Sequence, residues 1–234
     1  MKIDIKGVIV SNDDKWIYEW FGMEAISPKD ISQQIQKANG EDLEVIINSP
    51  GGDVFSGSEI YTLLKDYSGN VVVKIVGVAA SAASIIAMAG KKVMMSPTAE
   101  MMIHNVSSCA CGDYRDFEHE SKVLKDYNST IANAYMIKSG MTKEELLSMM
   151  DEETWLTPEK ALEYKLIDEI MFMDNTPKLA ASFGGIMLPP EVINKIRNTL
   201  KNPNHCSCQC SDSLMQQSKA KLNLLKLKGE MNNG

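Results

Sequence analysis

The chain has 234 residues, enough for one sizeable domain and an appendage, and its net charge of −7 argues against nucleic acid or an anionic membrane as the main partner. The charge is uneven, because residues 173–234 carry eight Lys and Arg against four Asp and Glu, which leaves residues 1–172 at −11. A basic tail of this kind either binds its own acidic body or an acidic partner, or is simply solvated.

The lack of a signal-peptide pattern, the lack of a membrane-spanning run and the number of cysteines together indicate the cellular compartment. The start of the chain alternates polar and apolar residues and lacks the apolar stretch of a signal peptide. No apolar run approaches the roughly 20 residues that span a bilayer. Five cysteines, an odd number, are typical of a reducing compartment rather than of a disulfide framework. We therefore expect a cytoplasmic protein with no membrane partner.

Strands and helices are predicted to alternate through residue 170. Strands are expected at 2–10, 43–48, 71–77, 92–96 and 101–103. Helices are expected at 28–39, 54–67, 81–89 and 114–139, after a capping box at Thr142, and after Thr157-Pro158. Residues 49–53 (Ser-Pro-Gly-Gly-Asp) are predicted to form a sharp turn. Strands that are apolar on both faces and alternate with helices predict an α/β fold with a largely parallel sheet.

The character of the sequence changes after residue 173. Pro and Gly punctuate a linker, and short helices are expected at 191–201 and 218–228. We therefore expect a domain at 1–172 and an extension at 173–234. Soft metal ligands occur within six residues at His205, Cys206, Cys208 and Cys210. They could bind zinc or copper(I), but so tight a run cannot easily place all four around one tetrahedral ion, and we expect neither a metal nor a cofactor.

Ser81 is the candidate nucleophile, because it ends an apolar strand pattern and begins a helix of small residues. Unpaired backbone N–H groups and the positive end of the dipole at a helix start stabilise developing negative charge. Small neighbours let a substrate backbone come close. A single serine does not identify a hydrolase. A general base, a group that orients the base and an oxyanion site are also required.

Three other segments could supply these groups. Gly51 and Gly52 follow a buried strand, where N–H groups can face a cleft without a Cβ in the way; an ordinary turn is the alternative. His104 follows an apolar strand and is a candidate base, although a lone histidine is more often structural. Asp151 or Glu153 could orient the imidazole, unless this acidic run is only a solvated turn.

The order of these segments resembles the ClpP serine peptidase family over roughly residues 2–172. The motifs that carry the resemblance are Asn-Ser-Pro-Gly-Gly at 48–52, Ala-Ala-Ser-Ala-Ala at 79–83, Met-Ile-His at 102–104 and the acidic-Thr-Trp-Leu-Thr-Pro run that begins at 151. The chain looks most similar to the ClpP-like peptidases of phages and prophages, the head maturation proteases. The resemblance implies a spiral core of repeated β-β-α units, as in crotonases, and a protruding handle helix at 112–141.

The resemblance also implies a role for each candidate. It makes Ser81 the nucleophile and His104 the general base, and it assigns the oxyanion hole to backbone N–H groups at Gly52 and Ala82, with Gly51 beside them. The family's aspartate falls on Glu153 by spacing from the tryptophan, and Asp151 is the nearest aspartate, so both stay candidates for the triad acid.

The activity implied is that of a serine endopeptidase, ATP-independent or partner-dependent, acting inside hexameric or heptameric rings, single or stacked. Its substrates would be proteins or peptides, such as capsid or scaffold proteins in phage head maturation. A crotonase-type acyl-CoA enzyme and a non-catalytic assembly or scaffold protein are the alternatives from other classes. A Ser–Lys membrane peptidase fits less well, given His104 and the lack of a membrane segment.

Overall fold

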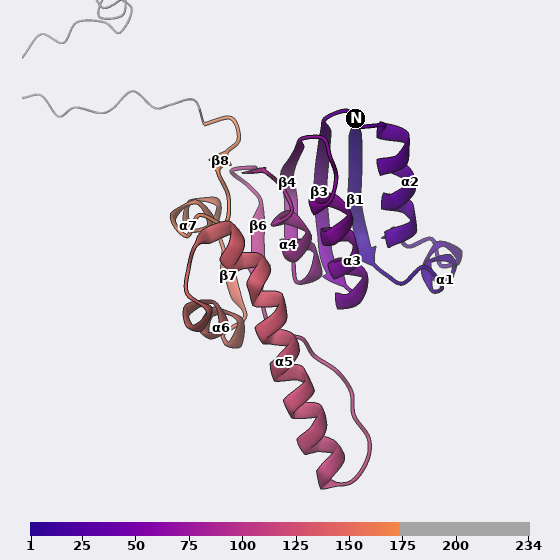
Figure 1. Ribbon diagram of the computed structural model, residues 1–234, viewed down its shortest axis with the longest axis vertical. Coiled ribbons are helices and arrows are strands. Elements are labelled where there is room, and N and C mark those ends of the chain that lie inside the picture. The colour runs from indigo at the N-terminus through magenta and orange to yellow at the C-terminus, as the bar shows by residue number, and fades with distance from the viewer. Residues whose placement is uncertain (174–234) are drawn as a thin grey trace, which may run out of the picture. The chain divides into compact units, whose positions relative to one another are not determined.

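The computed structural model describes residues 1–173, which lie within one compact unit (Figure 1). Its centre is an eight-stranded sheet in the order β2-β1-β3-β4-β5-β8, with β6 beside β4 and β7 beside β6. All pairs are parallel except β6–β7. The strands are β1 (Lys2–Ile9), β2 (Ala25–Ile26), β3 (Leu43–Gly52), β4 (Val71–Ala80), β5 (Lys92–Met95), β6 (Glu100–Ile103), β7 (Thr154–Leu156) and β8 (Glu169–Ile170). The predicted α/β class and the parallel sheet are confirmed.

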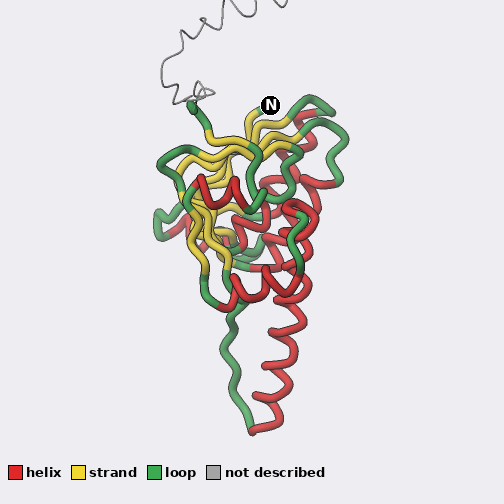
Figure 2. The backbone as a smooth tube through the Cα atoms, turned by 90° about the vertical axis from the view of Figure 1, so that its left-hand side faces the viewer, coloured by secondary structure: helices red, strands yellow, loops and turns green. Residues whose placement is uncertain are grey.

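Helices alternate with these strands and gather mainly along one face of the sheet (Figure 2). They are α1 (Lys15–Trp20), α2 (Pro28–Ala38), α3 (Val54–Lys65), α4 (Ala82–Ala87), α5 (Tyr114–Ser139), α6 (Lys143–Asp151) and α7 (Pro158–Glu163). The sequence patterns did not predict α1, β2, β7 or β8, which are short. In residues 1–173 no helix combines the length and the apolar character needed to cross a bilayer.

Aliphatic residues of the three central strands form the middle of the core. Ile5, Ile47 and Ile75 lie side by side on β1, β3 and β4, and all three are fully buried. Burial of a side chain of this size stabilises the fold by about 1.5–3 kcal/mol. The apolar strands therefore form the buried centre of the sheet. Ser81 and His104 directly follow the carboxyl ends of β4 and β6.

Helix starts agree with the capping signals. Ser27 and Asp30 form a capping box at α2, with Pro28 as the first helical residue. Thr142 and Glu145 form a second box at α6, and Asp113 and Asp116 form a third at the start of α5. Each box satisfies N–H groups that have no partner inside the helix.

The prediction of a sharp turn at residues 49–53 is wrong, because β3 continues through Gly52 beside β1. Gly51 and Gly52 have φ values of 96° and 146°, and a Cβ on Gly52 would lie 2.0 Å from the Ile9 carbonyl oxygen. The glycines thus let two backbones approach closely instead of reversing the chain. The strand ends only at Asp53, whose carboxylate accepts the Ser56 N–H at 2.7 Å and caps α3.

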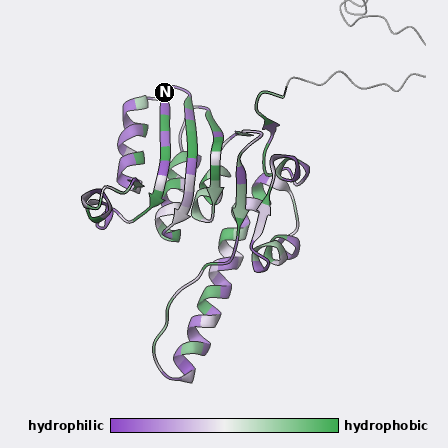
Figure 3. Ribbon diagram, turned by 180° about the vertical axis from the view of Figure 1, so that it is seen from behind, coloured by the Kyte–Doolittle hydropathy of each residue, from purple (hydrophilic) through white to green (hydrophobic). Residues whose placement is uncertain are grey.

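The predicted handle is also present. α5 spans Tyr114–Ser139, and its first half projects from the body with the segment that precedes it running alongside (Figures 1 and 2). This projecting half mixes hydrophilic and hydrophobic residues (Figure 3), and Tyr114 and Phe117 on it are exposed. The extension at 173–234, its two expected helices and the segment from His205 to Cys210 lie outside the described residues, apart from Met173.

Candidate active site

Ser81 occupies a strained position between β4 and α4. Its φ of 54° and ψ of −127° are unusual for a residue with a side chain and cost on the order of 1–3 kcal/mol. The Ser81 N–H donates to the Met102 carbonyl at 3.0 Å, which fixes the end of β4 to β6. The helix begins at Ala82, so Ser81 is the residue that caps α4 and not part of its first turn. Sharp strand-to-helix turns of this kind present a nucleophile at the top of a sheet.

His104 directly follows β6, and its ring reaches Ser81. Parallel pairing of Ala80 with Met102 brings the ends of β4 and β6 together, although 23 residues separate Ser81 from His104. The His104 Nε2 and the Ser81 Oγ lie 2.7 Å apart, and both side chains are partly buried. This distance is short enough for direct proton transfer between the hydroxyl and the imidazole.

The three residues expected at the oxyanion hole are close to Ser81 but are not equivalent. The Gly51 N–H already donates to the Ser49 Oγ at 3.1 Å, so it does not face the site as a free donor. A Cβ on Gly51 would lie 2.7 Å from that of Ser81, which shows how closely this backbone passes. Gly52 and Ala82 both line the cavity beside Ser81, and the Ala82 N–H has no partner inside the helix that it begins.

Neither expected acid contacts His104. Within residues 1–173, the His104 ring forms its hydrogen bond with Ser81, whereas Asp151 accepts the Asn105 side-chain amide at 2.7 Å. Glu153 accepts the Trp155 indole N–H at 3.3 Å. Trp155 is 48% exposed, so this ring does not anchor the acidic segment in the core.

The backbone nevertheless places Glu153 near the base. Ile103 pairs with Thr154 at the end of the antiparallel β6–β7 ladder, and His104 and Glu153 are the next residue on each side of that last pair. Glu153 also has a φ of 50°, a left-handed conformation that is uncommon for a residue of its size. Of the two candidate carboxylates, Glu153 is the one that follows directly on from this register, whereas Asp151 lies two residues further away in the chain.

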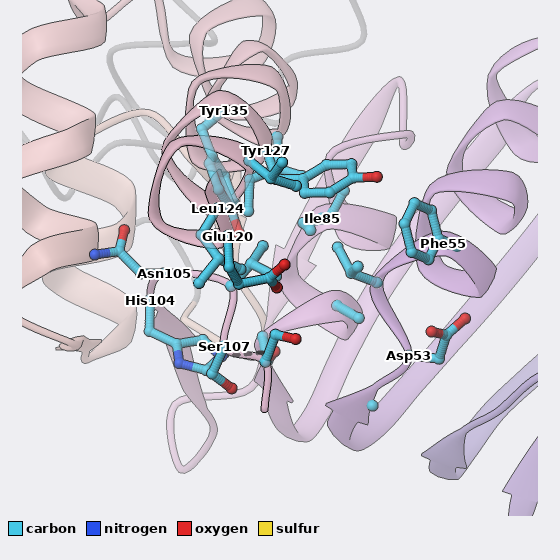
Figure 4. A pocket seen from close by; sticks show the side chains of 18 residues that line it. Asp53, Phe55, Ile85, His104, Asn105, Ser107, Glu120, Leu124, Tyr127 and Tyr135 are labelled. Carbon is cyan, nitrogen blue, oxygen red and sulfur yellow. Dashed lines mark hydrogen bonds between the residues drawn. The ribbon is translucent and has the colours of Figure 1, made fainter. Parts of the chain in front are cut away.

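A cavity of about 450 Å³ opens beside Ser81 and His104 (Figure 4). Side chains of α3, α4 and α5 form its apolar wall, among them Phe55, Ile85, Leu124 and Tyr127. The rings of Phe55 and Tyr127 meet edge to face with centroids 5.3 Å apart. Asp53 and Glu120 add carboxylates to the lining. The cavity can therefore hold an apolar side chain next to the nucleophile.

Three polar residues near the site were not predicted. Ser84 and Tyr135 are buried and bonded to each other at 2.7 Å, and Tyr135 also lines the cavity. Asn105 connects the segment after β6 to Asp151. The signal available for Ser84 is its position three residues after Ser81, from which a serine hydroxyl can reach the Ser81 carbonyl. Tyr135 comes 51 residues after Ser84, and no local pattern connects the two.

Known proteins resemble this chain in sequence and in fold. Residues 29–174 match the family described as Clp protease. An ATP-dependent Clp protease proteolytic subunit of Deinococcus radiodurans is 32% identical over 133 residues, covering 56% of this chain and 65% of the relative. Subunit 2 of Tropheryma whipplei is 30% identical over 160 residues, covering 64% of this chain and 88% of the relative.

A solved structure, a point variant of ClpP1 from Listeria monocytogenes, has a TM-score of 0.61 at 23% identity and covers 73% of this chain and 90% of its own. It supports the fold. The chain spans slightly less than two thirds of the length of the Deinococcus relative. The family match, in contrast, extends over more than half of the chain. On this basis the chain belongs to the Clp protease family.

Proposed function

We propose that the protein is a serine endopeptidase in which Ser81 is the nucleophile and His104 the general base. The observation that carries the proposal is the 2.7 Å contact between the Ser81 Oγ and the His104 Nε2. His104 takes the hydroxyl proton as Oγ attacks a peptide carbonyl carbon, and it returns the proton to the leaving amine. Water then attacks the acyl-enzyme by the same route and releases the acid product and free Ser81.

The developing oxyanion is assigned to the backbone N–H groups of Gly52 and Ala82. Both residues line the cavity beside Ser81, and each such donor contributes about 3–4 kcal/mol in hydrolases. Gly51 has a different role in this proposal. Its N–H is bonded to Ser49, and its missing Cβ leaves room for Ser81 and the substrate.

Glu153 is the proposed acid. The β6–β7 register puts it opposite His104, whereas Asp151 is engaged by Asn105. In this role the Glu153 carboxylate leaves the Trp155 indole and accepts the His104 Nδ1–H, which selects the tautomer whose Nε2 can take a proton from Ser81. A glutamate reaches further than an aspartate, which suits a residue that stands beyond the end of the ladder.

The assembly and the substrates are also proposals. The names of the Deinococcus and Tropheryma relatives describe proteolytic subunits of a Clp protease. We propose that this chain likewise forms hexameric or heptameric rings, with α5 at a contact between copies. The resemblance to phage and prophage peptidases favours capsid or scaffold proteins as natural substrates. Incubation with such precursor proteins and mass spectrometry of the products tests this part independently.

The peptidase proposal is tested by labelling the purified full-length chain with a fluorophosphonate probe and locating the adduct by mass spectrometry. We expect one adduct, on Ser81, and none in S81A. Ser107→Ala is the matched control, because Ser107 is an exposed serine that lines the same cavity. Absence of any adduct from wild-type protein whose assembly is confirmed by light scattering would favour a non-catalytic assembly protein.

A further inference from the structure

We propose that Ser84 and Tyr135 are positioning residues that hold the Ser81 backbone in its reactive conformation, an inference that rests on the proposed peptidase function. The starting observation is the carbonyl of Ser81. It accepts the Ser84 N–H at 2.9 Å and the Ser84 hydroxyl at 2.6 Å, so one residue holds this oxygen through two bonds.

Ser84 is a polar residue in an otherwise apolar, buried helix. α4 consists of six buried residues, and Ser84 is the polar one, with an exposure of 0%. A buried hydroxyl destabilises a core by roughly 1–3 kcal/mol unless it is hydrogen-bonded. The small, apolar neighbours Ala83 and Ala87 show that this helix accommodates alanine readily. The Ser84 hydroxyl therefore contributes hydrogen bonds that an alanine at this position would lack.

Tyr135 supplies the second bond of the Ser84 hydroxyl. It lies on α5, is 1% exposed, and its phenol oxygen is 2.7 Å from the Ser84 Oγ. A serine hydroxyl has one proton, and that of Ser84 goes to the Ser81 carbonyl, so Tyr135 must be the donor to Ser84. Burial raises the pKa of Tyr135 and outweighs the opposing hydrogen bond to Ser84, which keeps the phenol protonated as this direction requires.

The direction of the chain, from Tyr135 to Ser84 to the Ser81 carbonyl, explains how a strained residue is kept in place. With a φ of 54°, Ser81 persists only if its surroundings fix the peptide groups on both sides. The Met102 carbonyl fixes the N–H of Ser81. The Ser81 carbonyl is fixed by the two Ser84 donors, while the Ile85 N–H contributes a longer bond of 3.4 Å. Polarisation along connected hydrogen bonds strengthens each bond in a buried site. Loss of the chain allows the Ser81 Oγ to move away from His104.

The test compares four variants by steady-state kinetics, probe labelling and urea unfolding. In S84A we expect kcat to fall about tenfold with KM within about twofold, because the reactive geometry is lost and the cavity is not. S84A leaves the buried phenol of Tyr135 without its partner, so it also lowers stability. The double variant S84A/Y135F removes that unpaired phenol and should recover stability without recovering kcat. Y135F alone should lower kcat about threefold.

Ser139→Ala is the matched control. Ser139 is buried on the same helix as Tyr135, but its hydroxyl bonds the Tyr135 carbonyl and the Met141 N–H rather than Ser81. It should lose stability and keep wild-type kinetics. A double variant that regains kcat together with stability overturns the positioning role and leaves the peptidase intact, as does S84A with a wild-type labelling rate. A wild-type protein that is never labelled at Ser81 overturns both proposals.

Discussion

Asn105 donates its side-chain amide to Oδ1 of Asp151 at 2.7 Å and so joins the segment after β6 to the end of α6. This bond lies next to His104 in the chain. It explains how an acidic residue near the base can be structural, because a carboxylate held by Asn105 is not directed at the imidazole. The two candidate acids can therefore be separated by experiment.

Glu153→Gln should lower kcat by about 10²–10⁴-fold, because an amide cannot stabilise the imidazolium that forms on His104. Asp151→Asn should keep kcat within about threefold, since its amide oxygen can still accept from Asn105. Steady-state kinetics on a fluorogenic peptide measures both. The reverse result, with D151N inactive and E153Q unaffected, would make Asp151 the acid despite the register.

Gly52→Ala should destabilise the fold by about 2 kcal/mol or more, because its Cβ would overlap the backbone of β1 and neither strand can move freely. Urea unfolding of the purified variants measures this loss. Gly40→Ala is the control. Gly40 also has a left-handed φ, of 86°, but a Cβ added there would meet nothing within 4 Å, so this variant should show only the conformational penalty. Equal losses in the two variants would contradict the steric explanation.

Asp30→Asn should weaken stability at neutral pH and have little effect in acid. Burial raises the pKa of Asp30, but hydrogen bonds from Lys15 and Ser27 outweigh it and hold the pKa below its usual value of 3.8. A carboxyl with a lowered folded-state pKa stabilises the fold fully above the unfolded pKa, and this contribution disappears as the pH falls through the folded pKa. We expect D30N to lose about 1 kcal/mol at pH 7, as for a lost helix cap.

Urea unfolding of wild type and D30N from about pH 7 down to about pH 3 measures this difference in the range where a carboxyl titrates. The two free energies of unfolding should converge as the pH falls. Lys15 is the partner in the pair, 2.7 Å from Asp30, so K15M should show part of the same pH dependence. A difference between wild type and D30N that stays constant with pH would show that the charge of Asp30 is not its source.

Local patterns predicted those parts of the molecule that depend on local physics. The strands around Ile47 and Ile75, the caps at Ser27 and Thr142, and the span of α5 follow from apolar periodicity and from unpaired N–H groups at helix starts. Ser81 and His104 were selected by their places at strand ends and by the order of motifs, and the parallel β4–β6 pairing explains why these ends meet. Their contact required that long-range pairing, which no local window contains.

The remaining parts depend on tertiary context. Pro50-Gly51-Gly52 has the composition of a turn, but pairing with β1 keeps it extended. The bond between Ser84 and Tyr135 joins positions 51 residues apart whose partnership appears only when α5 packs on α4. The acid stayed open because three adjacent carboxylates have the same local pattern. The proposal of Glu153 over Asp151 rests on the register of β7 with β6, which no local window contains.

Phe55→Ala should change which peptides are cleaved without unfolding the protein. Phe55 is 59% exposed and its ring contacts that of Tyr127 in the cavity lining, so its removal takes little from the core but opens the apolar wall beside Ser81 (Figure 4). Loss of one aromatic contact should lower kcat/KM for a peptide with Leu before the cleaved bond by about 10–100-fold and leave a peptide with Ala there nearly unchanged. Phe21→Ala is the control, because Phe21 is 66% exposed on another part of the surface and should alter neither peptide. An equal loss for the Leu and Ala peptides would mean that Phe55 supports the site as a whole and does not select the side chain that enters it.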